Sequence, residues 1–455
     1  MGSIQEKKYL KWYNVLGYGT GDVAANLANA FINMFILIYM TDTVGVNAGV
    51  IGVMILVAKC FDGFTDLIFG HFIDRTKTKM GKARPWMFFA QFGVSICVVL
   101  MFSIPSSMSD TMKYVWFFLT YICEMSLFYT ANNIAYSSLT ALATKNSDER
   151  VLMGTVRFVF SIATNLFIAY VGVSLPAKIG FSQTAIIFSI AAIIINTIAV
   201  FSVRELPEDE LMDNSDDNAS KDTAAKPSLI ESLKIVFTNK YFIMVLLSYL
   251  LFYIYYGTMG SGVYYFTYVM HNANLYSTYS SANLLPMIPG LIITPILVKK
   301  FGMYKSNLAG YVVAIFASVL LMFGGFRGSF TVIMVATVLR ALGTAPLTGD
   351  QNALIAEASE YSYHKHGKRI DGMMYSCSTI GNKVGNGIGS AMTGILLAAS
   401  GYVSGAAEQS QSCINMLNGV FFVLPLIIMV LLFIDLFFLK VEDANKKWAA
   451  EHSTK

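Results

Sequence analysis

Long apolar runs separated by short polar stretches fill the 455-residue chain. Each run approaches the length of about 20 residues that a helix needs to cross a membrane. Twelve membrane-spanning helices are predicted, at 13–40, 50–73, 86–105, 113–141, 151–175, 184–203, 241–270, 281–298, 307–326, 330–357, 371–399 and 414–439.

One longer polar run, residues 204–240, lies between the sixth and seventh spans and carries seven acidic residues before 218. It cannot cross a membrane, so it divides the spans into two sets of six. The predicted fold is therefore an all-α, polytopic membrane protein with a six-helix bundle in residues 1–203, a cytoplasmic linker in 204–240, a second bundle in 241–440 and a cytoplasmic tail in 441–455.

The composition supports this architecture. Charged residues make up 13% of the chain, hydrophobic residues make up 55%, and the mean hydropathy is +0.57. A soluble domain carries about 25% charged residues, so a soluble enzyme is nearly excluded. The five scattered cysteines suggest neither disulfides nor zinc. The five histidines form no metal-binding motif, so we expect no enzyme activity and no cofactor. The N-terminus lacks the features of a cleavable signal peptide.

The positions of Lys and Arg predict the orientation in the membrane. If the N-terminus is cytoplasmic, 25 of the 32 basic residues fall in cytoplasmic segments and three, Lys113, Lys178 and Arg327, fall in outer loops. Both termini are therefore expected in the cytoplasm of a cell whose plasma or inner membrane holds the protein. The remaining four basic residues, which lie inside spans, are Lys59, Arg157, Arg340 and Lys383.

Charges inside a membrane usually face a partner or a wet cavity, because each costs about 3 kcal/mol or more. On the second span, Lys59, Asp62 and Asp66 are spaced i, i+3, i+7 and share one helix face. The two carboxylates repel each other unless a proton or cation binds, and Thr65 adds a hydroxyl. We therefore predict a site for a coupling cation, H⁺ or Na⁺; the alternative is that Lys59 neutralises the pair and locks the bundle.

A second polar set predicts a substrate seam. The first span has Asp22, Asn26 and Asn29 on one face, and the fourth has Thr130, Asn133 and Ser137. The fifth and eleventh spans add Arg157, Ser376, Thr379 and Lys383. Amides and charged groups hydrogen-bond pairs of sugar hydroxyls, so the set suits a carbohydrate. Polar contacts that hold helices together are the alternative.

Two further patterns allow a functional or a packing interpretation. Tyr249, Tyr253 and Tyr256 share one face of the seventh span, where packing or an interfacial belt is the simpler explanation. Gly381, Gly385 and Gly389 form two GxxxG motifs on the eleventh span. These glycines allow close helix packing and would also ease sliding between helices.

Several stretches of the chain resemble the glycoside–pentoside–hexuronide:cation symporters, a branch of the major facilitator superfamily. The resemblance covers nearly the whole chain and rests on GYGTGDVAANLANAF (17–31), TDTVG (41–45), FDGFTDLIFGHFIDRTKTKMGKARPW (61–86), NNIAYSSL (132–139), DERVLMGTVRF (148–158) and GKRIDGMMYS (367–376). It implies the major facilitator fold, with the substrate site near the midplane.

The resemblance also implies residue roles. In the melibiose carrier of this family, the positions of Asp62, Asp66, Thr65 and Thr130 bind the cation, with Asn in place of Thr65. The positions of Asp22, Asn133, Arg157, Thr379 and Lys383 bind or adjoin the sugar. That carrier has Asp where this chain has Asn133, and Trp where it has Ser137, which makes this chain more similar to glucuronide and pentoside carriers. Asn26, Asn29, Glu124, Arg340 and Asp350 have no counterpart that we can place.

Asn133 leaves Asp22 as the one carboxylate beside two cations, so an anionic sugar such as a uronide would fit the site. Neutral glycosides and pentosides are the alternatives. Glu124 lies nine residues before Asn133, about 180° around a regular helix, and is expected to face away from the seam.

The implied mechanism is alternating access by a monomer. Basic residues after the second span are expected to pair with Glu357, Glu360 or the acidic run and so gate the cytoplasmic side. The basic residues concerned are Arg75, Lys77, Lys79, Lys82 and Arg84, and Asp74 is expected to orient them; setting the membrane orientation is the alternative role of this loop. The predicted function is cation-coupled symport of a sugar or glycoside. The alternative is a carrier of another small organic solute or a lysolipid in the same superfamily, and no nucleic-acid partner is expected.

Overall fold

The computed structural model describes residues 7–144, 146–207, 229–366, 371–406 and 408–452. Across these residues the chain is helical and contains no β-strand, apart from an isolated bridge between Thr78 and Gly81. The predicted all-α class is therefore confirmed.

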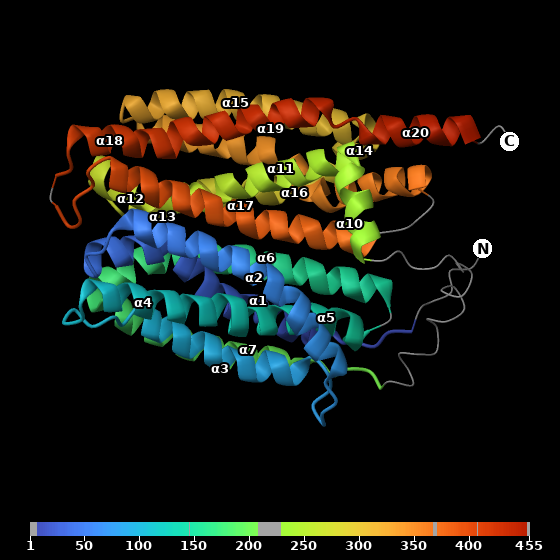
Figure 1. The fold of residues 1–455 in the computed structure, drawn as a ribbon, viewed down its shortest axis with the longest axis horizontal. Coiled ribbons are helices and arrows are strands. Elements are labelled where there is room, and N and C mark those ends of the chain that lie inside the picture. The colour runs from blue at the N-terminus through green and yellow to red at the C-terminus, as the bar shows by residue number, and fades with distance from the viewer. Residues whose placement is uncertain (1–6, 145, 208–228, 367–370, 407, 453–455) are drawn as a thin grey trace. The chain divides into compact units, whose positions relative to one another are not determined.

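Twelve helical stretches follow one another along the chain (Figure 1). In the first half they are α1–η1 (Trp12–Ile38, Tyr39–Thr43), α2 (Ala48–Arg75), α3 (Arg84–Met101), α4–η2–α5 (Asp110–Ile122, Cys123–Tyr129, Thr130–Ala143), α6 (Ser147–Ile179) and α7 (Phe181–Ser202). In the second half they are α11 to η4 (Lys240–Gly257, Thr258–Gly260, Ser261–Tyr264, Tyr265–Val269), α13–α14 (Leu275–Leu284, Met287–Phe301), α15 (Met303–Phe326), α16 (Phe330–His366), α17 (Asp371–Ala399) and α18–η5–α19 (Gln411–Asn418, Gly419–Val423, Leu424–Phe438).

Nine of these stretches, among the described residues, are long and apolar enough to cross a membrane. The other three are α2, α4–η2–α5 and α17, which are helical over the lengths predicted for spans. These three stretches carry most of the polar and charged residues that the sequence assigned to binding.

Three segments predicted as loops contain helix. Helix α10 (Leu229–Thr238) lies within the predicted linker, and α20 (Val441–His452) lies within the predicted tail. The tenth span, α16, continues as far as His366, so Glu357 and Glu360 lie on a helix and not on the loop expected for 357–371. Helix α20 and the end of α16 are polar, and α10 is amphipathic but only ten residues long, so none of them has the apolar length that predicts a span.

The described chain divides into two units. The first comprises Met1–Asn47 and Val57–Thr223, and the second comprises Ala48–Leu56 and Ala224–Lys455. In the first unit α1 packs against α6 and α7, and α3 packs against α5, η2 and α7. Its core includes Tyr18, Met87, Tyr136 and Leu139, all at most 1% exposed.

A glycine lets α1 approach α6 closely. A Cβ added at Gly19 would lie 2.5 Å from Cγ1 of Val156 on α6, a separation that real side chains do not tolerate. The GYGTG start of the first span is therefore what brings the polar face of α1 next to α6.

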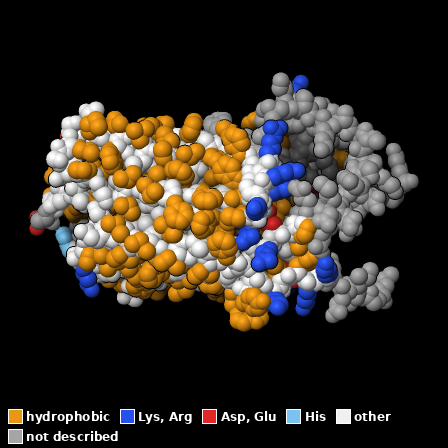
Figure 2. Space-filling view, turned by 90° about the horizontal axis from the view of Figure 1, so that it is seen from below, with side chains coloured by type: hydrophobic (Ala, Val, Ile, Leu, Met, Phe, Trp, Pro, Cys, Tyr) orange, Lys and Arg blue, Asp and Glu red, His pale blue; other side chains and the backbone are white. Residues whose placement is uncertain are grey.

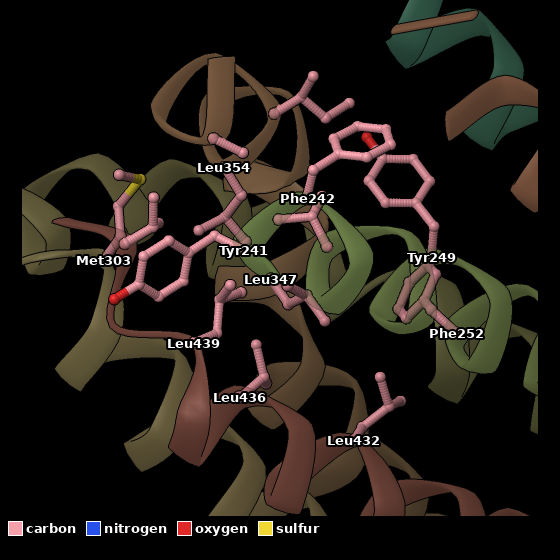
Figure 3. Close-up of a cluster of buried hydrophobic side chains, with 14 of the residues drawn as sticks. Tyr241, Phe242, Tyr249, Phe252, Met303, Leu347, Leu354, Leu432, Leu436 and Leu439 are labelled. Carbon is pink, nitrogen blue, oxygen red and sulfur yellow. The ribbon is translucent and has the colours of Figure 1, made fainter. Parts of the chain in front are cut away.

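In the second unit, α15 packs along α16 and α11 packs along α17. The buried core of this unit joins side chains from α11, α16 and α19 (Figure 3), including Phe242, Phe252, Leu347 and Leu432. Since every contributing helix is apolar on its buried side, hydrophobic burial accounts for the assembly of this unit.

The surface has the distribution that a membrane requires. Large apolar side chains such as Phe89, Ile96, Ile190 and Ile194 are more than half exposed. Figure 2 shows hydrophobic side chains over most of one face, with Lys and Arg side chains gathered towards one end. An apolar surface of this extent suits contact with lipid and not with water.

Candidate functional site

An ion pair between α1 and α6 lies at the centre of the predicted sugar seam. Nε of Arg157 is 2.7 Å from Oδ2 of Asp22, and their side chains are 21% and 15% exposed. Both residues were predicted from sequence, and the structure brings them together. Both charges are thus compensated while they remain partly accessible.

Two tyrosines hold this pair in place. The hydroxyl of Tyr136 on α5 is 3.2 Å from Oδ2 of Asp22 and also donates to the main-chain oxygen of Tyr18 at 2.9 Å. The guanidinium of Arg157 lies 4.0 Å from the centre of the Tyr136 ring. The glycine before Asp22 permits this arrangement, because a Cβ at Gly21 would be 2.7 Å from the Tyr136 ring.

A cavity of about 310 Å³ opens at this point, lined by Asp22, Gly154, Arg157, Phe158 and Ser161. It combines a carboxylate, a guanidinium, a hydroxyl and an aromatic ring. The charged groups suit paired hydroxyls and the ring suits an apolar sugar face, so the lining has the chemistry expected of a carbohydrate site.

Asn26 and Asn29 occupy the next turns of α1. The amide of Asn26 donates to Ser161 Oγ at 3.1 Å and accepts from Asn165 Nδ2 at 3.1 Å, both on α6. The side-chain oxygen of Asn29 accepts a hydrogen bond from Asn33, one turn further along α1. The predicted polar face of α1 is therefore continuous, but these two amides already have protein partners.

Asn133 and Ser137 are exposed on one face of α5, whereas Tyr136 between them is buried. The predicted face of the fourth span is therefore accessible at these two positions.

Two of the residues predicted to bind the cation meet between α2 and the start of α5. The hydroxyl of Thr130 is 2.5 Å from Oδ1 of Asp62, and both residues are buried. Asp66 lies one turn further along α2 and is half-buried. Thr65 does not join the carboxylates here, because its hydroxyl donates to the main-chain oxygen of Asp62 at 3.0 Å.

Lys59 belongs to the same cluster. Its side chain is 5% exposed and interacts electrostatically with Asp62. Its ammonium group also donates to Oδ1 of Asn33 on α1 at 3.1 Å. The sequence interpretation missed Asn33, although it lies eleven residues after Asp22 and therefore shares the polar face of α1.

Glu124 was expected to face away from the sugar seam. It is fully buried, whereas Asn133 is exposed, so the two side chains do not share an environment. The carboxylate of Glu124 interacts electrostatically with Asp62 and Lys59, a neighbourhood that the sequence interpretation did not predict. Glu124 belongs to η2, a π-helical stretch over Cys123–Tyr129.

Thr379 and Lys383 lie on α17 in the second unit, where Thr379 is exposed and Lys383 half-buried. Thr379 lines a cavity of about 430 Å³ with Gln351, Asn352 and Asn382. Tyr249, Tyr253 and Tyr256 line the same cavity, their neighbouring ring centres 6.1 Å apart. The tyrosines therefore face a partly polar cavity, which the packing interpretation did not predict. The side chain of Ser376 lies outside the described part of the structure.

The candidate gating residues have the following local partners. The carboxylate of Glu205 accepts main-chain N–H bonds from Lys82, Ala83 and Arg84 at 2.6, 2.9 and 3.0 Å. Glu205 belongs to the acidic run named in the sequence prediction, so one acidic residue of that run does hold the basic loop. Arg75, Lys77 and Lys79 are exposed, and the side chain of Asp74 lies outside the described part.

Glu357 accepts from Asn445 of α20 at 2.7 Å, and Glu360 lies 3.7 Å from His364. These are contacts within the second unit.

Two charged residues of α16 have roles that the sequence left open. Arg340 is 1% exposed, donates to the Tyr279 hydroxyl at 2.8 Å and lies 5.3 Å from the centre of the Tyr255 ring. Asp350 is buried and accepts from Asn307 at 2.9 Å. Both are enclosed in the second unit.

No group of three His, Cys, Asp or Glu side chains suited to a metal ion occurs among the residues that the structure describes. The carboxylate and hydroxyl oxygens of Asp62 and Thr130 are ligands of the kind that a small monovalent cation or a proton takes.

Comparison with known proteins gives the family context. The family described as MFS/sugar transport protein matches residues 17–443. The isoprimeverose transporter of Lactiplantibacillus pentosus is 30% identical, over 99% of this chain and 93% of its own length. The glucuronide carrier protein homolog of Escherichia coli K12 is 28% identical, over 96% and 94%.

Among solved structures, the nucleoside transporter NupG superposes with a TM-score of 0.65 at 12% identity, covering 94% of this chain and all of that one. A likeness at this identity concerns the fold alone.

Proposed function

Because this chain belongs to the MFS/sugar transport protein family, we propose that it carries a sugar or glycoside across the membrane by cation-coupled symport. It is a multi-pass membrane transporter and not an enzyme, and the resemblance to glycoside–pentoside–hexuronide:cation symporters is confirmed. The substrate, the coupling ion and the roles of individual residues are the proposed part.

The observation that carries the substrate proposal is the Asp22–Arg157 pair at the edge of a cavity. A carboxylate accepts from two neighbouring hydroxyls, and a guanidinium donates two parallel hydrogen bonds. Asn26, Asn29, Asn133 and Ser137 supply further polar groups on α1 and α5. Thr379 and Lys383 on α17 are further candidate sugar-binding residues.

The coupling cation, H⁺ or Na⁺, would bind at Asp62 with Thr130, and with Asp66 and Thr65 one turn away. A cation there offsets the repulsion among the buried carboxylates, which is the electrostatic reason for its uptake. The loaded carrier would then alternate between outward- and inward-open states around a fixed site.

We infer four further features from the sequence. The carrier acts as a monomer, and both termini lie in the cytoplasm. The basic loop with Asp74, Arg75, Lys82 and Arg84, together with Glu357 and Glu360, forms the cytoplasmic gate. The bundles in 1–203 and 241–440 would be the two bodies that move.

The test is binding of a glycoside panel to the purified full-length protein, read as a rise in unfolding temperature with and without Na⁺ and at pH 5.5 and 8. At least one sugar should stabilise the wild type, and a cation should enhance that effect. Asp22→Asn should lose the response to sugar. Asp62→Asn should keep it but lose the effect of the cation. Asp110→Asn, an exposed carboxylate paired with Lys113, is the matched control and should behave as wild type.

Competition between members of the glycoside panel identifies the class of sugar. Competition by glucuronides alone would indicate an anionic substrate, and competition by neutral glycosides or pentosides would reject that assignment. Stabilisation by lysolipids but by no sugar would overturn the proposed function.

A further inference from the structure

Four polar residues follow one face of α1. Asp22, Asn26, Asn29 and Asn33 are spaced i, i+4, i+7 and i+11, so they form a line along the helix. Amides inside a membrane span are costly unless they are hydrogen-bonded. The structure gives each of these side chains a partner, and the partners divide into two groups.

Asp22 and Asn26, the lower-numbered pair, belong to the proposed sugar site. Asp22 binds Arg157 on α6, and Asn26 binds Ser161 and Asn165 on the same helix. These residues lie at or next to the cavity between α1 and α6.

Asn29 and Asn33, the higher-numbered pair, lie towards the cation cluster. This name is used for Lys59, Asp62 and Thr130. Oδ1 of Asn33 accepts from the ammonium group of Lys59 at 3.1 Å. The amide nitrogen of Asn33 donates to the main-chain oxygen of Asn29 at 2.9 Å and also to its side-chain oxygen. Lys59 is thereby connected to Asn29 through one side chain.

Asn29 lies on the same face of α1 as Asn26 and Asp22. Lys59 is therefore connected, through Asn33 and Asn29, to the helix face that carries the sugar-site residues.

We propose that Asn29 and Asn33 are positioning residues that couple the occupancy of the cation cluster to the affinity of the sugar site. This proposal rests on the proposed symport. A cation arriving at Asp62 repels the Lys59 ammonium group, which lies one turn away on the same helix. Asn33 receives the displaced ammonium group more closely, and the bond from Asn33 to Asn29 passes the change to the face of α1 that holds Asn26 and Asp22.

The observable is the ratio of sugar dissociation constants without and with the cation, because coupling is a property of two sites and not of either one. The probes are the glycoside that stabilises the wild type and Na⁺ at constant ionic strength, with a second series from pH 8 to 5.5. A ratio in the usual range of about 5 to 150 is expected for the wild type.

Asn33→Ala should bring this ratio close to 1 while it leaves the sugar dissociation constant without cation within about threefold of wild type. Asn33 is exposed, so its truncation should not unfold the protein. Lys59→Met should also remove the coupling, and the double variant Lys59→Met/Asn33→Ala should lose no more than either single variant.

Asn165→Ala is the matched control, since it removes an asparagine from the sugar side of the same network. It should weaken sugar binding equally with and without cation and leave the ratio unchanged. If Asn33→Ala shows the same ratio as the wild type, the proposed coupling role of Asn29 and Asn33 is wrong and the proposed symport is unaffected. If the sugar affinity of the wild type depends on neither Na⁺ nor pH, both the proposed symport and the proposed coupling role are wrong.

Discussion

Two side chains of opposite charge, Asp22 and Arg157, share a partly buried environment in which each compensates the charge of the other. A partly desolvated ion pair adds little net stability, but losing one member leaves an uncompensated charge, which costs about 3–5 kcal/mol in buried cases. Binding and stability therefore depend on this pair in different ways, and substitutions can separate them.

We predict that Asp22→Ala lowers the free energy of unfolding by up to about 3 kcal/mol, because Arg157 keeps its charge without a partner. The double variant Asp22→Asn/Arg157→Gln should recover most of this loss, since no charge remains. Neither variant should bind sugar. Thermal unfolding and sugar binding of the purified proteins check both statements; a double variant less stable than Asp22→Ala would contradict the charge argument.

Substitutions of Glu124 and Lys59 are expected to have opposite effects on the stability of the protein. Both oxygens of Glu124 are buried and make no hydrogen bond among the described residues, and the nearby carboxylate of Asp62 repels them. Glu124→Gln should therefore leave stability unchanged or raise it by about 1 kcal/mol. Lys59→Met should lower stability, because Asp62 and Glu124 then lack their cation.

Unfolding temperatures measured at one pH for the two single variants and the double variant check this prediction. A fall of several degrees in Glu124→Gln would mean that its carboxylate has a stabilising partner.

At the scale of single helices, regular stretches were predictable and irregular ones were not. The 100° spacing correctly grouped Asp22 with Asn26, and Lys59 with Asp62, because α1 and α2 are regular α-helices through these residues. The π-helical stretch η2 was not predicted, nor was the position of Glu124 near Asp62 and Lys59. Nothing in CEMSLFY marks a wide turn in the sequence, since such turns depend on packing with neighbouring helices.

The GxxxG motifs of α17 are explained by packing. A Cβ at Gly389 would lie 2.1 Å from the main-chain oxygen of Ile254 on α11, and a Cβ at Gly385 would lie 2.6 Å from that of Leu250. Neither helix can yield without moving its backbone.

Gly389→Val should therefore lower the free energy of unfolding by at least about 2 kcal/mol, as overpacking does. Gly419→Ala serves as the control, because a Cβ there has nothing within 4 Å. The control should change stability by less than about 1 kcal/mol. Equal unfolding temperatures for the two variants would mean that α11 and α17 are loosely packed and that the glycines serve another purpose.

For the whole molecule, the sequence predicted the class, the number of helical stretches and their order. The sites were predicted in part, because a helical pattern tells which residues share a face but not which faces meet. The line Asp22, Asn26, Asn29 was visible, whereas its bonds to Arg157 and Ser161 of α6 and to Tyr136 of α5 depend on which helices meet. Asn33 was missed because its partner, Lys59, had already been assigned to the carboxylates.

The orientation of the whole chain gives a direct test. Single cysteines introduced at Lys79 and at Ser107, in a variant without the five native cysteines, should differ in reactivity towards a membrane-impermeant maleimide. Ser107 should react in intact cells and Lys79 only after permeabilisation, because the basic segments are predicted to be cytoplasmic. The opposite labelling pattern would reverse the topology.

Arg340 has a consequence for how the chain is made. Placing an arginine at the centre of a single helix costs about 2.5–3.5 kcal/mol when that helix leaves the translocon for lipid. The side chains that receive it, Tyr255 of α11 and Tyr279 of α13, are synthesised earlier. The tenth span should therefore enter the bilayer together with α11 and α13, which are synthesised before it and remain beside the translocon. The helices of the second half are then expected to insert as a group and not one by one.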